Sequence, residues 1–597
     1  MDDSFEASFA VGIDLGTTNT ALSAVPLGVE DAVPGVFPLP QVVQPGELRE
    51  EPLLPSFLYL PADAELPPGS IDLPWYPNAR AVVGRFARDR GAGSPARLVS
   101  SAKSWLSHAG VDRRAAILPW GAPGEVPRVS PLEASARYLA HVVAAWDEAH
   151  PDHPLYDQDV VLTVPASFDA VARELTAEAA QLAGLGENLR LLEEPQAALY
   201  AWLADRGPRW RDDVTVGDVI LVCDIGGGTT DFSLIAVTSD SGSLELERVA
   251  VGDHILLGGD NMDLALAYTV RRRMEADGNA LDDWQMRALT HGCRAGKEAL
   301  FGDASLDAWP LVVPGRGSRL IGGTLRTELT REELTRVLLD GFFPVVGSDA
   351  RPQAPRRLGL TSLGLPYAHD AGMTRHLAAF LGREGLDRRV PGRGLVHPTA
   401  VLFNGGVTRS PLIRDRIMDV LTAWCVDDGG QAPKVLDGDQ PDLAVSRGAA
   451  WYARVRREGG LRIRGGTARS YYVGVERAEL AVPGIPPQVD ALCIAPFGME
   501  EGSEVTLPEL FGLFVGEPAA FQFFGSSTRR SDEVGTVVDP RELEELSPIE
   551  TTLAGEDTGV VPVRLHARVT EVGTLDLSAV AEADARRWRL SFNVRVE

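Results

Sequence analysis

VILVCDIGGGTTDFSLIAV, residues 219–237, is an apolar run that ends in Asp224, turns through three glycines and two threonines, and continues as a second apolar run. Residues 9–25, FAVGIDLGTTNTALSAV, have the same order around Asp14. Apolar runs joined by a Gly-rich turn are typical of β-hairpins. Because two similar units lie far apart in one chain, the sequence predicts a duplicated domain with two related lobes.

Strands and helices alternate around the two hairpins. Further strands are predicted at residues 160–164 (VVLTV) and 400–404 (AVLFN). Helices are predicted at residues 98–106, 131–148 (with Ser130 as its cap), 170–183, 262–276, 284–300 and 442–456. This alternation indicates an α/β fold. Two stretches without a sustained period, 26–77 and 348–398, are predicted to be a surface excursion and an irregular insertion.

The composition excludes several classes of function. The chain has 597 residues, too many for one hydrophobic core, and a net charge of −27. Nucleic-acid binding depends on Lys and Arg, so an acidic chain without a basic block is not expected to bind nucleic acid. The N-terminus is unlike a signal peptide, and no apolar run approaches the ~20 residues of a membrane helix. The four cysteines form no CxxC pair. We therefore expect a cytoplasmic protein.

Lysine is rare in this chain. The only lysines are Lys103, Lys297 and Lys434. An ammonium group is a compact point charge, whereas a guanidinium is a broad fork. A site that must place one charge beside a phosphate could therefore require lysine, although chance survival is an equally simple explanation.

The two hairpins carry residues suited to phosphate and metal. Gly-rich turns direct backbone N–H groups toward anions, and Asp14 and Asp224 end the strands that enter these turns. Mg²⁺ prefers one or two carboxylates together with substrate phosphates. Two such turns facing each other across a cleft would suit Mg-ATP, with both carboxylates near the metal.

Composition changes after residue 455. Residues 456–470 are rich in Gly and Arg and are predicted to be a linker. Residues 471–597 consist of short β-like runs separated by turns, which predicts an all-β sandwich or barrel. Residues 1–455 would then be the first domain.

Six motifs carry a family resemblance: GIDLGTTNT, TVPASFDAVAR, EEPQAALYA, DIGGGTTDFS, LLGGDNMD and FNGGVTRSP. They occur in the order and approximate spacing of the ATPase domain of the seventy-kilodalton heat-shock (Hsp70, DnaK-like) chaperones, which this chain resembles over about 400 residues. The resemblance implies an α/β, actin-like ATPase fold of two duplicated lobes, followed by a β-sandwich of the substrate-binding type. It also implies ATP and Mg²⁺ as cofactors.

The resemblance assigns roles to individual residues. Asp14 and Asp224 would hold Mg²⁺ through water. The catalytic residues would be Lys103, Asp14, Glu194, Asp224, Thr229 and Asp231. The nucleotide would be bound by Gly16, Thr17, Thr18, Asn19, Gly226, Gly227, Gly228, Thr229, Gly258, Gly259, Lys297, Gly405, Gly406, Arg409 and Asp442. Pro165 and Arg173 match residues that relay nucleotide state outward, the alternatives being a strand-ending proline and an exposed helix arginine.

The chain departs from the family pattern in its adenosine-binding helix, its linker and its C-terminus. Arg294 replaces an expected ribose-binding carboxylate, and Glu298 replaces an arginine that stacks on adenine, so base recognition is open. The family linker is acidic, whereas residues 456–470 carry five arginines. The chain ends directly after its last predicted strand, so we expect a variant without the helical lid. Strand aromatics could line a peptide groove or belong to the core: Phe511, Phe514, Phe521, Phe523 and Phe524.

The resemblance implies a molecular chaperone that couples ATP binding and hydrolysis to the binding of peptide or unfolded protein clients, in protein folding and the stress response. J-domain and nucleotide-exchange co-chaperones are expected partners, whereas nucleic acid and membranes are not. The alternatives are an actin-like ATP-dependent filament or scaffold protein, a small-molecule kinase of the same superfamily, and an ATP sensor with little hydrolysis.

Overall fold

The computed structural model describes residues 7–591 with internal gaps. These gaps are residues 64, 109, 187–188, 241–242, 314–323, 354–363, 384–393, 439, 460–462, 465–466, 468–469, 478–487, 500–502, 517, 527–528, 530, 553–558, 570–574 and 585. The chain divides into two compact units. The first consists of Met1–Ser167, Glu178–Leu244 and Val251–Arg462, and the second of Phe168–Ala177, Glu245–Ala250 and Ile463–Glu597.

The first hairpin is the centre of a sheet in the first unit. The strand order is β11-β10-β1-β2-β3, with β6 also paired to β2. The strands are β1 (Phe9–Leu15), β2 (Asn19–Pro26), β3 (Gly35–Phe37), β6 (Leu54–Pro55), β10 (Asp159–Val164) and β11 (Arg190–Glu193). Val11 and Ile13 of β1 are fully buried, as expected for a strand covered on both faces.

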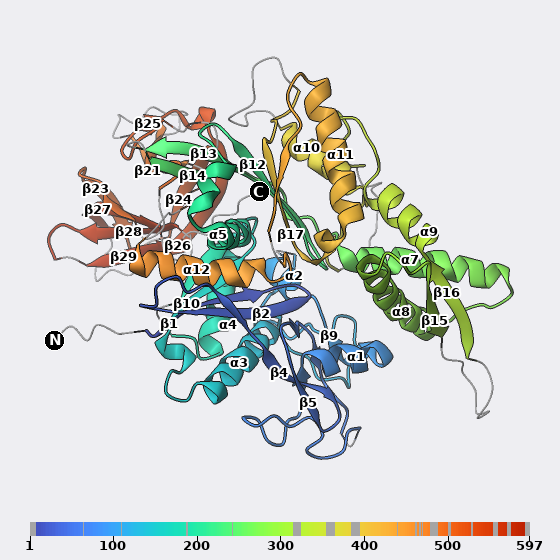
Figure 1. Cartoon of the computed structure of the whole chain (residues 1–597). Helices are drawn as coiled ribbons and strands as arrows, with labels where there is room; N and C mark the ends of the chain where they lie inside the picture. The colour runs from blue at the N-terminus through green and yellow to red at the C-terminus, as the bar shows by residue number, and fades with distance from the viewer. Residues whose placement is uncertain are drawn as a thin grey trace. The chain divides into compact units, whose positions relative to one another are not determined.

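The second hairpin is the centre of a sheet with the same order, β18-β17-β12-β13 (Figure 1). Its strands are β12 (Val219–Ile225), β13 (Thr230–Asp240), β17 (Ala400–Asn404) and β18 (Lys434–Leu436). In both sheets the first hairpin strand pairs antiparallel with the second hairpin strand and parallel with a later strand. The shared strand pattern agrees with the predicted duplication, and the described elements confirm the mixed α/β class.

Most predicted helices are present, within a few residues at each end. They are α3 (Pro131–Ala149), α4 (Ala170–Leu182), α7 (Gly259–Ala276), α8 (Asp283–Gly302) and α12 (Ala444–Glu458). Ser130 caps α3 as predicted, because its hydroxyl accepts a hydrogen bond from the Glu133 N–H at 3.0 Å. Helices α5 (Glu194–Arg206) and α11 (Pro411–Asp427) have no counterpart in the prediction. No helix in the described part of the chain has the length and apolar character needed to cross a membrane.

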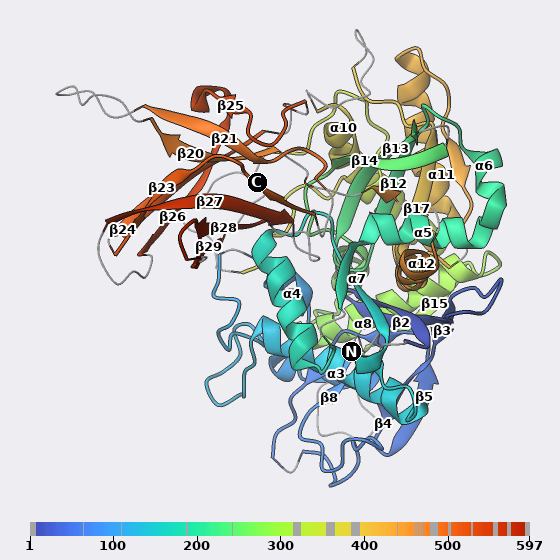
Figure 2. The ribbon, with the colours of Figure 1, turned by 90° about the vertical axis from the view of Figure 1, so that its left-hand side faces the viewer.

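Helix α12 packs at very close range on β1 and on α5, beside which it lies in Figure 2. A Cβ atom on Gly448 would be 1.7 Å from the Ala197 carbonyl oxygen, and one on Gly12 would be 2.2 Å from the Ser446 carbonyl oxygen. The Ser446 hydroxyl also lies 2.8 Å from the Ser23 hydroxyl. Because only glycine permits such backbone contacts, Gly448 sets how closely α12 approaches α5, and Gly12 sets how closely it approaches the first hairpin.

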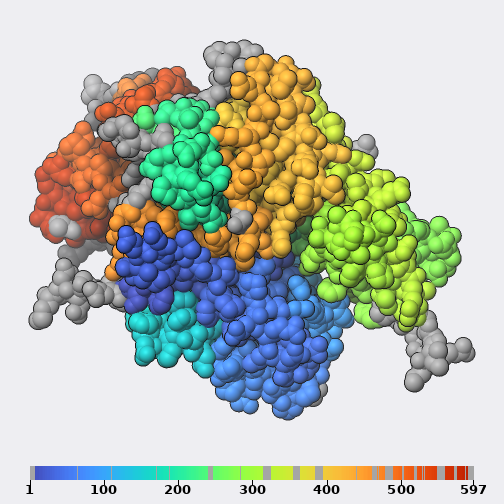
Figure 3. All heavy atoms as spheres, in the orientation of Figure 1, coloured from blue at the N-terminus to red at the C-terminus, as the bar shows by residue number. Residues whose placement is uncertain are grey.

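Residues 26–77 are not a surface excursion, and that prediction is wrong. They contain the strands β4 (Leu39–Gln44), β5 (Glu47–Glu51) and β7 (Leu58–Tyr59). The strands β8 (Val82–Val83) and β9 (Leu98–Val99) follow this stretch. A separate core forms around them and α1 (Arg85–Gly93), and its buried members are Val42, Phe57, Tyr59, Ile71, Val82, Phe86 and Ala87. In Figure 3 this part of the chain, in blue, is a continuous packed mass. Strands of two to six residues are too short to show a period, so the pattern concealed their burial.

Two further predictions need correction. The helix predicted at residues 98–106 is shorter, because Ser101 has a φ of 55° and α2 spans only Ala102–Ser107. The stretch 348–398 is not irregular throughout, because it contains α10 (Met373–Leu381), whose apolar face is buried. Its segments 354–363 and 384–393 lie outside the described residues.

The remaining elements of this unit include β15 (Ala308–Val313), β16 (Leu325–Thr330), α6 (Trp210–Asp213), α9 (Arg331–Thr335) and the short π-helix Arg336–Asp340.

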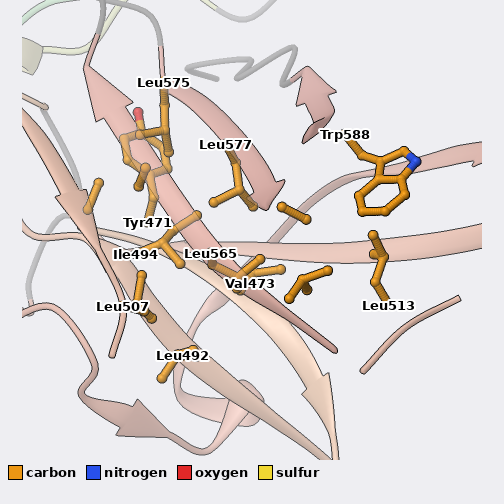
Figure 4. Packing of buried hydrophobic residues seen from close by; sticks show 14 of the residues in the cluster. Tyr471, Val473, Leu492, Ile494, Leu507, Leu513, Leu565, Leu575, Leu577 and Trp588 are labelled. Carbon is orange, nitrogen blue, oxygen red and sulfur yellow. The ribbon is translucent and has the colours of Figure 1, made fainter. Parts of the chain in front are cut away.

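Two antiparallel five-stranded sheets form most of the second unit, as the all-β prediction requires. One has the order β25-β21-β20-β24-β26, and the other has β22-β27-β28-β29 with β23 paired to β27. The strands are β20 (Ser470–Glu476), β21 (Val489–Ala495), β22 (Glu504–Thr506), β23 (Phe511–Val515), β24 (Pro518–Ser526), β25 (Val537–Val538), β26 (Glu544–Thr552), β27 (Gly559–Val569), β28 (Leu575–Ala581) and β29 (Arg587–Ser591). Tyr471 and Val473 of one sheet share a core with Leu565, Leu577 and Trp588 of the other (Figure 4).

The strand aromatics mostly belong to this core. Phe523 and Phe524 are buried, and Phe511 and Phe521 are partly buried against the main cluster. Phe514 alone of the five is exposed, at 60%. The predicted linker is partly regular: its first three residues end α12, and Ile463 of β19 (Ile463–Arg464) pairs with Leu246 of β14 (Ser243–Val251). Residues 460–462, 465–466 and 468–469 of the linker lie outside the described residues.

Candidate functional site

The turns of the two hairpins are in contact. A Cβ atom on Gly227 would lie 2.2 Å from the Thr18 hydroxyl oxygen, and one on Gly228 would lie 2.7 Å from the Thr17 methyl carbon. A larger residue at either glycine would therefore push the turns apart. The contact brings together both sets of predicted phosphate-binding residues, Gly16, Thr17, Thr18 and Asn19 with Gly226, Gly227, Gly228 and Thr229.

Two more glycine turns adjoin the second hairpin. The Gly259 N–H donates to the Gly226 carbonyl at 3.1 Å, and the Asp260 N–H donates to the Gly227 carbonyl at 2.7 Å. Gly405 has a φ of 85°, and a Cβ atom there would be 2.4 Å from the Ile225 carbonyl oxygen. The positive φ and the close backbone contact both favour glycine at position 405. The turns Gly258–Gly259 and Gly405–Gly406 thus lie directly beside the turn that follows Asp224.

Asp14 and Asp224 occupy equivalent positions in the two lobes, and each has a neutral donor beside it. The Thr163 hydroxyl donates to Asp14 Oδ1 at 3.3 Å, and the Asn404 side-chain amide donates to Asp224 Oδ2 at 2.6 Å. Each donor comes from the neighbouring parallel strand, where it pairs in register with its aspartate. The duplication therefore repeats a carboxylate and its donor as well as the strands.

The buried charges of the site include one ammonium and several carboxylates. Burial raises the pKa of Asp14 to about 7, and the Lys103 ammonium opposes this rise. Burial and the Glu194 carboxylate raise the pKa of Asp224 well above its ordinary value. Burial disfavours the charged form of Lys103, but its ion partner Glu194 and the nearby Asp14 outweigh this and raise the pKa of Lys103. A bound cation would relieve the excess negative charge.

Asp231 follows the second turn and shares one of its oxygens between two donors. Its Oδ1 accepts hydrogen bonds from the Ser167 hydroxyl at 2.9 Å and from His254 Nδ1 at 3.1 Å. Burial disfavours a charged imidazole at His254, yet the Asp231 carboxylate raises the pKa of His254 above its ordinary value.

Charged residues also connect α7 and α8. Arg294 forms an ion pair with Asp260, and its Nε lies 2.8 Å from Asp263. Lys297 Nζ lies 2.6 Å from Asp263 and donates to the Gly259 carbonyl at 3.2 Å. The arginine that replaces the expected carboxylate is therefore paired with two carboxylates of the neighbouring helix.

The remaining predicted adenosine residues lie around the same turns. Lys297 Nζ and a Val407 methyl carbon each lie 3.3 Å from the position of a Cβ atom on Gly259, which brings α8 and the Gly405–Gly406 turn together there. Arg409 is 65% exposed and lies 3.1 Å from Asp442. Glu298 is exposed on α8.

Of Pro165 and Arg173, only Arg173 differs from its simplest interpretation. Pro165 is buried directly after β10. Arg173 is only 7% exposed, and its Nε donates to the Phe168 carbonyl at 3.3 Å. The alternative of an exposed helix arginine is therefore wrong, and the relay role stays a prediction.

A family model for Hsp70 protein matches residues 115–340. The chain is 30% identical over 460 residues to the chaperone protein HscA homolog of Bordetella pertussis, and 31% identical over 465 residues to that of Bordetella petrii. The HscA homolog of Ralstonia nicotianae is 30% identical over 456 residues. By these matches the chain is similar to chaperones of the Hsp70 family. The alignments cover 74–75% of this chain and 58% of the length of each of these relatives.

The segment matched by the family model contains only one of the two hairpin turns. The second turn and Asp231 lie within residues 115–340, whereas Asp14, Lys103 and Gly405 lie outside them. Only the tertiary structure places the residues from outside this segment around the same site.

The residues present fit a nucleotide with its metal. The Thr18 hydroxyl oxygen is buried and has no hydrogen-bond partner among the described residues, so it is available to a phosphate oxygen. Asp14 and Asp224 supply the one or two carboxylates that Mg²⁺ prefers when phosphates complete its coordination.

The sequence did not single out Thr163, Ser167, His254 and Asn404. Thr163 and Asn404 had a usable signal, because each is a polar residue in or at the end of an apolar predicted strand, VVLTV or AVLFN. Ser167 lies in the motif TVPASFDAVAR, and His254 precedes the LLGG turn. Nothing in either stretch indicates that both contact Asp231.

Proposed function

We propose that this protein is an ATP-dependent chaperone of the Hsp70 type. Its first region would have the actin-like ATPase fold of two duplicated lobes, and its β-rich region would be a sandwich that binds clients. The contact of the two Gly-Thr turns, with Asp14 and Asp224 at the ends of the strands that enter them, carries this proposal. Backbone N–H groups in such turns suit phosphates, and the relatives found are named as chaperones.

Hydrolysis would depend on positioning and electrostatics, because phosphoryl transfer requires little covalent chemistry from the protein. Lys103, held by Glu194, would lie near the terminal phosphate and stabilise the charge that develops there. Thr229 would contribute to the second phosphate turn, and Asp231 would orient the attacking water. Mg²⁺, held through water by Asp14 and Asp224, would neutralise phosphate charge.

Adenosine would lie beside the turns Gly258–Gly259 and Gly405–Gly406. Lys297 would approach the ribose from α8, and Arg409, with its partner Asp442, would flank the base. Asp260, rather than a residue of α8, would supply a carboxylate near the ribose, because Arg294 occupies the position expected for one.

The nucleotide state would be coupled to peptide or unfolded protein clients, with J-domain or nucleotide-exchange proteins as co-chaperones. The filament and kinase alternatives are not favoured, since the relatives found are named as chaperones. An ATP sensor with little hydrolysis would share the same site and differ only in turnover.

The test uses the purified full chain. Calorimetry should detect Mg²⁺-dependent ATP binding, and phosphate release without an added acceptor should follow. A panel of hydrophobic peptides should bind with an affinity that differs between ADP and ATP. Binding without phosphate release would assign a sensor, ATP-dependent sedimentation would assign a filament, and absence of ATP binding would overturn the proposal.

A further inference from the structure

The Asp231 carboxylate is held on one side only. Its Oδ1 accepts both the Ser167 hydroxyl, at 2.9 Å, and His254 Nδ1, at 3.1 Å. Within the described residues, no hydrogen bond reaches Oδ2. The side chains are largely buried, with exposed fractions of 12% for Asp231 and 16% for His254. Two fixed donors on one oxygen restrict rotation of the carboxylate and leave the other oxygen available.

The backbone fixes His254 in this position. The Thr230 N–H donates to the Ile255 carbonyl at 2.9 Å, and the Ile255 N–H donates to the Thr230 carbonyl at 3.2 Å. The Gly252 N–H donates to the Phe232 carbonyl at 2.8 Å. These bonds fasten the segment around His254 to the start of β13, so His254 and Asp231 are neighbours across a short antiparallel bridge.

Ser167 reaches the same oxygen from a different part of the chain. It follows β10, the strand next to Asp14, and is separated from Asp231 by 64 positions. The Asp231 carboxylate also acts on the Lys103 ammonium, so it lies on the side of the site where Lys103 and Glu194 meet. An ionised carboxylate only accepts hydrogen bonds, so both Ser167 and His254 Nδ1 must act as donors.

We propose that Ser167 and His254 are positioning residues that hold Asp231 through Oδ1, so that Oδ2 can orient the water that attacks the terminal phosphate. This inference rests on the proposed ATPase function. Reacting atoms must be aligned closely for an efficient step, and a displacement of ~1 Å can reduce a rate about 100-fold. Loss of either donor would free the carboxylate to rotate and would lower turnover without removing a contact to the nucleotide.

The experiment compares single-turnover ATP hydrolysis with ATP affinity in matched variants. His254→Ala and Ser167→Ala should each reduce hydrolysis about 10- to 100-fold and leave the Kd for ATP within about twofold. His254→Asn and Ser167→Thr keep a donor and should recover most of the rate. His153→Ala, at an exposed histidine, should match the wild type.

The outcomes separate this inference from the proposed function. A wild-type chain that binds no ATP, or binds it without hydrolysis, would overturn both the ATPase function and this inference. Normal wild-type hydrolysis with unchanged alanine variants would overturn the inference alone. An equal loss of rate in the alanine and donor-retaining variants would also contradict it, because a general packing defect would then explain the loss. If His254→Ala fails to fold, Ser167→Ala and Ser167→Thr still decide the question.

Discussion

Asn404, the last residue of β17, pairs in register with Asp224 of the adjacent parallel strand β12, and the Asn404 side-chain nitrogen lies 2.6 Å from the Asp224 carboxylate. Asn404 is 1% exposed, and its Oδ1 has no hydrogen-bond partner in the described part of the chain. The amide nitrogen, rather than the amide oxygen, therefore faces Asp224 and donates to it. Asn404 therefore fixes the orientation of a carboxylate that is proposed to lie near Mg²⁺.

Asn404→Leu should weaken Mg²⁺-dependent ATP binding about 10-fold, because groups that orient a metal-site ligand typically contribute 10- to 100-fold in affinity. Calorimetric titration of ATP at several Mg²⁺ concentrations measures the effect. Asn279→Leu, at an exposed asparagine, is the control. A variant with the Mg²⁺ dependence of the wild type would show that Asn404 serves only the packing of β17.

Lys103→Ala should slow single-turnover hydrolysis by about 100- to 1,000-fold, the usual effect of removing a charge or donor that acts on the transition state. ATP affinity should change much less, since the interaction strengthens mainly in the transition state. Lys434→Ala provides a matched control, because Lys434 is exposed and bonds to the Asp213 carbonyl. Unchanged hydrolysis in Lys103→Ala would remove Lys103 from the site.

Glu298→Arg should tighten ATP binding about two- to fivefold, the equivalent of ~0.5–1 kcal/mol for a cation stacked on an aromatic ring at an exposed site. Glu298 is free to be replaced because it is exposed, whereas Arg294 is held by Asp260 and Asp263. Calorimetry with Glu298→Gln as the control separates stacking from loss of negative charge. Weaker binding in Glu298→Arg would mean that this position does not face the base.

His141 should make the first unit sensitive to acid. It is buried on α3, with Nε2 2.9 Å from the Pro40 carbonyl oxygen and its ring edge-on to Trp75 at 5.4 Å. Burial lowers the pKa of His141 to about 4. The unfolded chain therefore takes up a proton between about pH 6.5 and pH 4 that the folded chain does not, so stability is lost as the pH falls through this window.

His141→Gln should remove this contribution, which amounts to about 2 kcal/mol at pH 5. Urea denaturation at pH 7 and pH 5 measures it as a smaller difference in unfolding free energy for the variant than for the wild type. His153→Gln, at an exposed histidine, should retain the wild-type difference. Equal acid sensitivity in all three proteins would show that other groups control it.

The sequence alone determined the two hairpins, their turns and the α/β class. Asp14, Asp224 and the glycines around them form contiguous motifs, and hairpins depend on local contacts whose residue types can be read in order. The scarcity of lysine was also informative, since Lys103 and Lys297 both lie among the predicted site residues and Lys434 does not.

Only the tertiary structure decided how these parts meet. Asn404 joins Asp224 across 180 positions, and Ser167 and His254 reach Asp231 from opposite sides of it in the sequence. The same holds for the packed core of residues 26–77 and for the burial of Arg173. Each depends on strand register and on the close approach of distant segments. These features cannot be predicted from a local sequence pattern, because they are stabilised by burial and pairing between different elements rather than within one element.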